Sequence, residues 1–140
     1  MKRSNKNNEW VEGPVFRSLV RSMKREMMRK YDFNKGMGFV YLMCSENGYY
    51  KIGRAKDVKR RLDGLVRQFP IRIEVEHRIA CLDYCQVEGF LHEKFAEKRV
   101  QHEWFKLDPQ DVDWIKSQKD YDLDTKEVKR EAARRGISYE

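Results

Sequence analysis

Long apolar runs are absent from this 140-residue sequence, and cysteine and proline occur only three times each. No segment approaches the roughly 20 apolar residues that a membrane-spanning helix needs, so we expect no membrane partner. The first residues also lack the apolar stretch of a signal peptide, which predicts a cytoplasmic protein. The three cysteines, Cys44, Cys81 and Cys85, fit a reducing compartment better than a disulfide scaffold.

Internal repeats and low-complexity tracts are also absent, and 40% of the residues are apolar against 38% charged. A chain of this length and composition buries an ordinary hydrophobic core, which predicts one folded domain with appended elements. We assign residues 1–35 to a basic N-terminal arm and helix, residues 36–118 to the central domain, and residues 119–140 to a charged C-terminal tail.

Positive charge is concentrated near the start of the chain. Residues 1–30 contain nine Lys and Arg and three Asp and Glu, a balance of +6, whereas the remaining residues have a balance of +1. A basic arm on a near-neutral body is typical of a protein that binds a polyanion, most simply nucleic acid. The alternative is a solubilising helix with a solvated charged face, and charge alone does not decide between the two.

The basic arm is predicted to form a helix over residues 14–31. Pro14 suits its first turn, and the apolar residues that follow recur at helical spacing. Arginines and lysines occupy the rest of the helix circumference. The residues that we assign to nucleic-acid contact are Arg17, Arg21, Lys24 and Arg25, together with Arg54 in the central domain.

A β-hairpin is predicted around Asn47 and Gly48, which separate two short β-prone runs. A two-residue loop pairs Glu46 with Tyr49, whereas a three-residue loop with Gly48 in the left-handed conformation pairs Ser45 with Tyr49. The second register separates apolar from polar side chains better, so we adopt it. It places these residues on one core face: Val40, Leu42, Cys44, Tyr50 and Ile52.

The register decides which polar side chains meet, because a slip of one residue moves every side chain to the opposite face. In the adopted register Tyr41 and Lys51 share the face opposite the core. Asp57 is a good N-cap for a helix over residues 58–68, and Arg61 lies at the margin of its apolar stripe. Arg61 is therefore placed to lie against the sheet and reach a ligand, while Arg60 and Arg67 point away.

The rest of the chain predicts an α+β fold with a small three-stranded antiparallel sheet flanked by helices. Alternating apolar residues over 71–79 indicate the third strand. A helix over residues 84–98 follows, with Val87, Phe90, Leu91 and Phe95 toward the core and with Glu88 and His92 sharing another face. Further elements are a short extended segment at 104–105, a helix that begins at 108–109, and a terminal helix around 125–135.

The order of hairpin, helix with Arg61, strand and helix with Glu88 resembles the GIY-YIG nuclease superfamily. The branch that it resembles is the one catalogued from a phage T5 open reading frame and a meiotically up-regulated yeast gene. The resemblance covers about residues 38–107, and its pieces are specific in their order and spacing. They are Val40 and Tyr41, then Lys51 to Gly53, Asp57 to Leu62, Val87, Glu88, Leu91, His92 and Phe95, and last Glu103 to Phe105.

The resemblance implies a DNA endonuclease of the kind that phages and mobile elements encode, which hydrolyses phosphodiester bonds with one Mg²⁺ or Mn²⁺. Tyr41 is then the general base, and Lys51 lowers its pKa or holds the nucleophilic water. Arg61 binds the scissile phosphate. Glu88 is the protein ligand of the metal, and His92 touches phosphate or the leaving oxygen.

Two positions depart from the pattern of the superfamily. Lys51 occupies the place of a signature tyrosine, and no asparagine stands near the end of the domain, where residues 101–105 read Gln-His-Glu-Trp-Phe. Each site residue also has an ordinary structural interpretation. Tyr41 suits a half-exposed strand, Arg61 is spaced to pair with Asp57, and Glu88 suits a solvated helix face.

Other functions remain open on the sequence. A non-catalytic nucleic-acid-binding module of the same fold, or an effector that binds another protein, are the alternatives to the endonuclease. A zinc site built from Cys81 and Cys85 with His92 and His102 is a further alternative, although its spacing is less regular than that of structural zinc sites.

Overall fold

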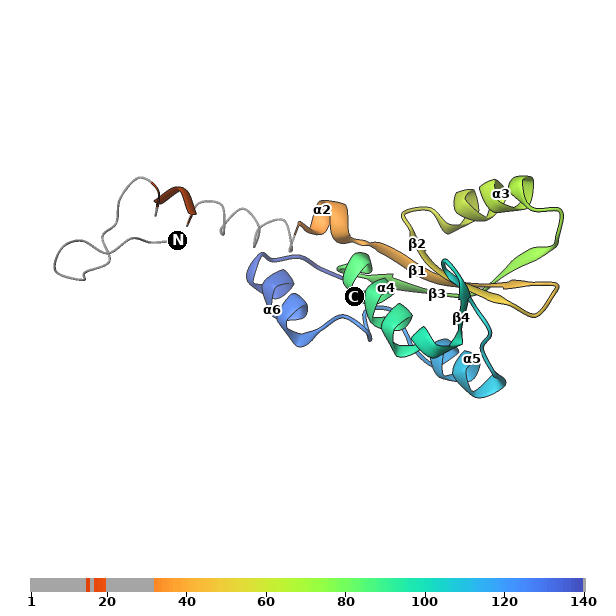
Figure 1. Cartoon of the computed structure of the whole chain (residues 1–140). Helices are drawn as coiled ribbons and strands as arrows, with labels where there is room; N and C mark the ends of the chain where they lie inside the picture. The colour runs from red at the N-terminus through yellow and green to blue at the C-terminus, as the bar shows by residue number, and fades with distance from the viewer. Residues whose placement is uncertain (1–14, 16, 20–31, 140) are drawn as a thin grey trace. The chain divides into compact units, whose positions relative to one another are not determined.

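The computed structural model (Figure 1) describes residues 15, 17–19 and 32–139 and divides the chain into two units, Met1–Asp32 and Phe33–Glu140. In the first unit, residues 15 and 17–19 are helical, in agreement with the helix predicted over 14–31. Arg17 belongs to this described part. Arg21, Lys24 and Arg25 lie outside the described residues.

The second unit is built on an antiparallel sheet whose strands lie in the order β3-β1-β2-β5-β4. The prediction of an α+β fold is confirmed, but the prediction of three strands is wrong, since the described residues form five. The two additional strands are three and two residues long, too short for an alternating pattern to indicate them. The strands are β1 (Gly38–Ser45), β2 (Tyr50–Ala55), β3 (Ile73–Cys81), β4 (Arg99–Gln101) and β5 (Trp104–Phe105).

The register of the β1–β2 hairpin is the one that the sequence favours. Cys44 pairs with Tyr50, the backbone N–H of Ser45 donates to the carbonyl of Tyr49 at 2.8 Å, and Gly48 has a φ of 86°. A positive φ at the last loop position suits glycine because it has no Cβ. The register places Tyr41 and Lys51 on one face of the ribbon, as predicted.

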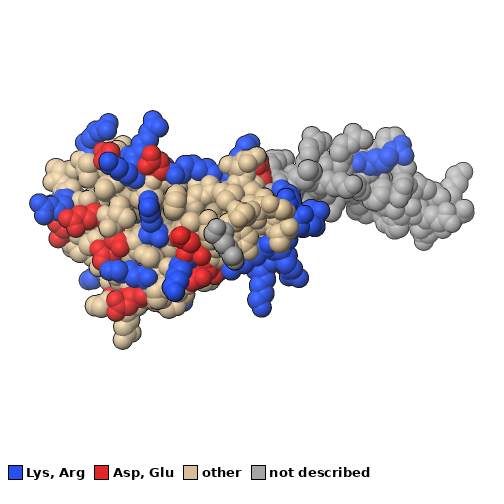
Figure 2. Space-filling model, turned by 180° about the vertical axis from the view of Figure 1, so that it is seen from behind, with Lys and Arg blue, Asp and Glu red and all other residues tan. Residues whose placement is uncertain are grey.

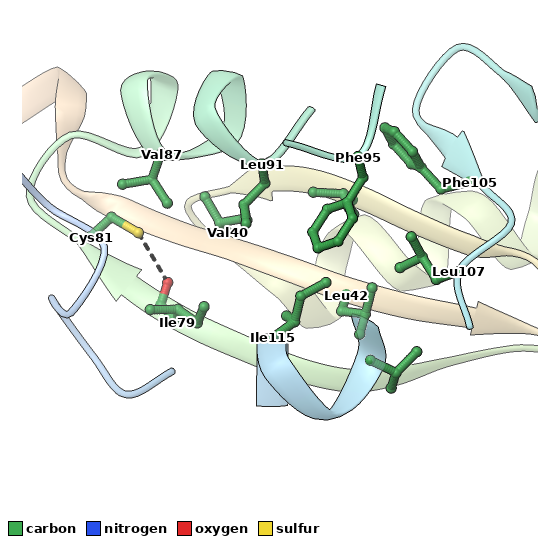
Figure 3. Packing of buried hydrophobic residues seen from close by; sticks show 12 residues of the cluster. Val40, Leu42, Ile79, Cys81, Val87, Leu91, Phe95, Phe105, Leu107 and Ile115 are labelled. Atoms are coloured by element: carbon green, nitrogen blue, oxygen red, sulfur yellow. Dashed lines mark hydrogen bonds between the residues drawn. The ribbon is translucent and has the colours of Figure 1, made fainter. Parts of the chain in front are cut away.

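Both faces of the sheet are covered by helices, whereas the sequence predicted one core face. Figure 1 shows α3 (Val58–Gln68) on one side and α4 (Tyr84–Lys94), α5 (Pro109–Lys116) and α6 (Lys126–Arg134) on the other. The α3 side buries Tyr41, Met43, Ala55, Val58, Leu65 and Ile73. On the α4 side, Val87 and Leu91 project from α4 toward β1, and Ile115 projects from α5 (Figure 3).

Strand β3 contributes to both cores because it contains a bulge. Its register against β1 shifts between Leu42 and Met43, so that Glu76 has no partner. An extra residue in one strand reverses the faces of the side chains that follow. Ile73 therefore packs on the α3 side, while Ile79 packs on the α4 side. The apolar residues whose alternation over 71–79 indicated the strand therefore do not share one face.

The sequence predicted where the helices begin more accurately than where they end. Asp57, Asp83, Asp108 and Thr125 each cap a helix by accepting a backbone N–H. Helix α4 ends at Lys94 and is followed by the 3₁₀ turn η1 (Ala96–Lys98), so the prediction of one helix to Lys98 is wrong. The prediction that Phe90 faces the core is wrong, because this residue is 46% exposed. Helix α2 (Phe33–Gly36) was not predicted.

The segment after α5 lies along the outer edge of β3. The Asp120 carboxylate accepts a hydrogen bond from the backbone N–H of Ala80 at 2.9 Å. The backbone N–H of Tyr121 donates to the carbonyl of Ala80 at 2.8 Å. Asp124, which is buried, accepts the N–H groups of Leu82 and Asp83. Val128 and Ala132 of α6 are also buried, so the segment that the sequence presents as a charged tail carries core residues.

Within the described part of the chain, no helix has the length and apolarity that crossing a membrane requires.

A pair of glycine variants tests the hairpin. A Cβ on Gly53 would overlap the Tyr41 phenol, 2.5 Å from its Cζ, whereas a Cβ on Gly64 in α3 meets nothing within 4 Å. Gly53→Ala is expected to lower the free energy of unfolding by about 1–3 kcal/mol. Gly64→Ala is expected to raise it by about 0.5–1 kcal/mol. Urea unfolding measures both, and a Gly53→Ala protein as stable as the parent would contradict the packing of Tyr41 on β2.

Candidate functional site

Tyr41 and Lys51 lie together under α3. Tyr41 is opposite Gly53 across the hairpin and is 2% exposed. The Lys51 Nζ lies 5.5 Å from the centre of the Tyr41 ring. The Tyr41 hydroxyl has no hydrogen-bond partner among the described residues, although it is buried. A buried hydroxyl without a partner carries a desolvation cost, which is uncommon in a purely structural tyrosine.

Burial raises the pKa of the Tyr41 phenol above its ordinary value of 10.0. The positive charges of Lys51 and Arg61 lower this pKa and the carboxylate of Glu103 raises it, but burial outweighs the cations. Lys51 therefore lowers the pKa of Tyr41, as the sequence suggests, but the net shift of this pKa is upward. In the free protein the phenol is neutral at pH 7.

Glu103 is the site residue that the sequence analysis did not assign. Its carboxylate forms an ion pair with Lys51, which is itself 7% exposed. The turn before it places His102 at a φ of 53°, and the carbonyl of Glu103 accepts the N–H of Ile52 at 3.0 Å. The signal was available, because Glu103 was part of the family resemblance and stands near the position of the missing asparagine.

Glu88 comes from α4 and reaches the same place. It is 8% exposed, and its carboxylate accepts a hydrogen bond from Arg54 at 3.1 Å. Burial raises the pKa of Glu88, the charge of Glu103 adds to the rise, and Arg54, His92 and Lys51 oppose it. The solvated surface position that is the ordinary interpretation of Glu88 does not apply.

His92 lies one turn after Glu88 with both ring nitrogens engaged. Its Nε2 lies 2.8 Å from the carbonyl of Ile52, and its Nδ1 lies 3.1 Å from the Arg99 guanidinium. A carbonyl only accepts and a guanidinium only donates, so Nε2 carries the proton and Nδ1 accepts. This arrangement holds the imidazole ring against β2, with both ring nitrogens engaged by groups of the protein.

The three residues Glu88, His92 and Glu103 each offer a ligand atom within 4.8 Å of the others. Among the described residues, this is the one group of three or more potential metal ligands, and it includes neither Cys81 nor Cys85. Cys81 is buried and Cys85 is exposed. The zinc site considered from the sequence therefore has no support in the described structure.

A cleft of about 800 Å³ lies beside these carboxylates, with α3 as one wall. A second hollow of about 620 Å³ adjoins it, and both are lined by Leu65, Gln68, Glu88 and Glu103. The second hollow also contains Lys51, His92 and Arg99. The cations that line the first, which we call the basic cleft, are Arg54, Lys56, Arg60 and Arg61.

Arg61 is exposed in the basic cleft, and no hydrogen bond or ion pair engages its guanidinium among the described residues. The pairing with Asp57 that its spacing allows does not form. Arg60 also lines the basic cleft, so the prediction that it points away is wrong. Lys56 donates to the carbonyls of Asn34 and Lys35 at the end of α2.

Charge outside the basic cleft is mixed on the face that Figure 2 shows, where Lys and Arg side chains are interspersed with Asp and Glu over much of the described body. Arg17, the described member of the predicted nucleic-acid-binding helix, is exposed.

The pKa of Tyr41 can be measured directly. We expect its phenol to ionise above pH 10.0, because burial outweighs the neighbouring cations. Lys51→Met should raise this pKa further, since it removes the largest opposing charge. NMR of ¹³Cζ-labelled tyrosine during a pH titration, with Tyr41→Phe for assignment, gives both values. Ionisation of Tyr41 below pH 10.0 in the parent protein would mean that the neighbouring cations outweigh burial.

The comparisons with known proteins give one match. The T5orf172 domain matches residues 38–118, which include both strands of the hairpin and the residues Glu88, His92 and Glu103. No curated protein and no solved structure matches the chain. This match is consistent with a nuclease-like or DNA-binding module. Since the match covers more than half of the sequence, the chain belongs to the T5orf172 domain family.

Proposed function

We propose that the protein is a metal-dependent DNA endonuclease of the GIY-YIG type. The observation that supports this most is the convergence of groups from separate segments. Lys51, Arg61 and Glu88 line two adjoining hollows, and Tyr41 lies directly beneath Lys51. Sheet packing accounts for the ring of Tyr41, but it accounts neither for a buried unpartnered hydroxyl nor for a buried carboxylate beside the basic cleft.

The donor atoms at Glu88 fit Mg²⁺ or Mn²⁺. Both ions favour carboxylate oxygen and keep waters and phosphate oxygens as further ligands, which an open cleft accommodates. Burial, with the charge of Glu103 added to it, raises the pKa of Glu88, and a divalent cation would compensate the buried negative charge. When bound, the metal supplies electrostatic stabilisation of the phosphate oxygens.

The protein's own groups divide the remaining tasks. Arg61 has a free planar guanidinium in the basic cleft and is suited to bind the scissile phosphate and offset charge on its oxygens. Lys56 and Arg60 extend the positive charge along the strand that carries the phosphate. The Tyr41 phenol must first ionise, which Lys51 favours. Its phenolate oxygen then holds the attacking water and takes the proton, which regenerates the neutral phenol.

A second candidate is a DNA-binding module without hydrolysis. The specific observation in its favour is that Lys51 is paired with Glu103 while the Tyr41 pKa is raised, which leaves no strong base in the free protein. Such a module would bind DNA with steep dependence on salt and would leave the strands intact.

Replacing the metal-binding carboxylate separates these candidates. Glu88→Gln is expected to abolish nicking of supercoiled plasmid in Mg²⁺ or Mn²⁺, a loss of about 100-fold or more. Glu93→Gln, an exposed position on the same helix, is the control and should cut like the parent. No nicking by the parent protein, with salt-dependent DNA binding retained, would favour the binding module. Undiminished nicking by Glu88→Gln would remove Glu88 from the mechanism.

The same variant should fold well. A carboxyl with a raised pKa in the folded state binds its proton more tightly there, so its ionised form opposes folding above that pKa. The neutral amide removes this opposition, and Arg54, whose side chain is 44% exposed, can be hydrated without its partner. At pH 7 the melting temperature of Glu88→Gln should equal or exceed that of the parent. A large decrease would mean that Glu88 is a structural residue.

A pair of arginines on α3 tests the phosphate contact. Arg61→Ala is expected to reduce cleavage by about 10²–10³-fold, because the guanidinium faces the basic cleft. Arg67→Ala removes the same charge from an exposed position outside the cleft and should have little effect. Both variants should remain within about 0.5 kcal/mol of the parent stability. Equal losses of cleavage in the plasmid assay would assign the effect to general charge instead of a specific contact.

A further inference from the structure

We infer that Glu103 is a second ligand of the metal, so that the cation is held between two carboxylates, Glu88 from α4 and Glu103 from the β4–β5 turn. The inference rests on the proposed function, and it concerns a residue for which the family resemblance gives no role. In the free protein Lys51 forms an ion pair with the Glu103 carboxylate, and the metal ion displaces Lys51 from this pair.

The geometry permits one ion to bind both groups. Their ligand atoms lie within 4.8 Å of each other. Oxygens on opposite sides of a cation that binds at about 2.0–2.6 Å are separated by about twice that distance, so small rotations of the side chains are sufficient. The turn is fixed in place, because His102 has a left-handed backbone and the carbonyl of Glu103 is bonded to β2.

The third member of the group is excluded by its own hydrogen bonds. The His92 Nε2 donates to Ile52 and its Nδ1 accepts from Arg99, so neither nitrogen has a lone pair free for a metal. The remaining donors are all carboxylate oxygens. This donor set favours a hard ion such as Mg²⁺ or Mn²⁺ over Zn²⁺, which prefers nitrogen and sulfur.

An independent observation points to a ligand at the same place. The Tyr41 side chain is 2% exposed and its hydroxyl has no partner among the described residues. The Lys51 Nζ lies 5.5 Å from the centre of the Tyr41 ring and is ion-paired with Glu103, so the phenol lies beside this pair. A water bound to a cation between Glu88 and Glu103 would give it the missing partner.

The carboxylates are also unequally paired in the absence of a cation. Glu88 is bonded to Arg54, whose side chain is 44% exposed, and Glu103 is bonded to Lys51, whose side chain is 9% exposed. Two carboxylates so close repel each other, and a single divalent charge between them removes the repulsion. Lys51 therefore competes with the metal for Glu103, and removing Lys51 should strengthen metal binding.

Terbium luminescence tests the inference without measuring cleavage. Tb³⁺ is a hard ion that takes oxygen ligands, and Trp104 follows Glu103 directly and can sensitise its emission. Emission gives the affinity, and lifetimes in H₂O and D₂O give the number of bound waters. Displacement by Mg²⁺ or Mn²⁺ shows that the site is shared. The proteins compared are the parent, Glu88→Gln, Glu103→Gln, Lys51→Met and, as the control, Glu93→Gln.

We expect Glu103→Gln to bind Tb³⁺ at least about tenfold more weakly and to add about one or two bound waters, since a carboxylate ligates through one or two oxygens. Lys51→Met should bind Tb³⁺ more tightly than the parent does. If Glu103→Gln fails to fold, the Tb³⁺ affinity of Lys51→Met tests whether Glu103 is a ligand. Weaker binding with an unchanged water number would make Glu103 a remote charge and overturn the inference. Weaker or unchanged binding by Lys51→Met would also overturn it.

The outcomes distinguish this inference from the function on which it rests. If Glu88→Gln loses Tb³⁺ while Glu103→Gln keeps both affinity and water number, the cation site stands and Glu103 is only the partner of Lys51. If the parent protein binds neither Tb³⁺ nor Mn²⁺, the metal-dependent endonuclease and the second ligand both fail.

Discussion

The pairing of β1 with β2 is the constraint on which the rest of the site depends. Because the loop contains three residues and ends in Gly48 with a positive φ, Tyr41 is opposite Gly53 and Lys51 shares its face. The missing side chain at Gly53 is what leaves room for the phenol over the strand. A slip of one residue would place the tyrosine and the lysine on opposite sides of the ribbon and disperse the pocket.

A short strand allows the two layers of the fold to meet. Strand β5 pairs with β2 only at Tyr50 and Lys51. Beyond that point no strand of the described residues covers the outer edge of β2, and Glu88 from α4 meets both Arg54 and the group around Glu103 there. Helix α3 forms the wall on the other side. The basic cleft therefore combines Glu88 and Arg54 from the α4 side of the sheet with Arg60 and Arg61 from the α3 side.

The sequence was informative where local chemistry decides the structure. Gly48 and the N-caps Asp57 and Thr125 act within a few residues of themselves, and the hairpin and helix starts follow from them. It was not informative where packing between distant segments decides. The exposure of Phe90 and the place of Arg60 depend on how α4 and α3 rotate against the sheet.

Glu103 shows the same limit within the site. Strands of three and two residues, joined by a turn through His102, leave no periodic pattern. The position of the Glu103 carboxylate therefore depends on contacts with β2, which lies about fifty residues away in sequence. The resemblance named the residue because of its neighbours, Trp104 and Phe105. Only the ion pair with Lys51 indicates what the carboxylate does.

The segment along β3 has a consequence for the limits of the domain. The family match ends at residue 118, where the backbone that shields the open side of β3 begins with Gln118, Asp120 and Tyr121. A fragment cut at the family boundary would present that strand with free amides and carbonyls, a template for intermolecular β-sheet. Asp124 would also be lost from the start of α4, the helix that carries Glu88. The stretch that matches the family is therefore shorter than the stretch that shields the edge of β3 in this chain.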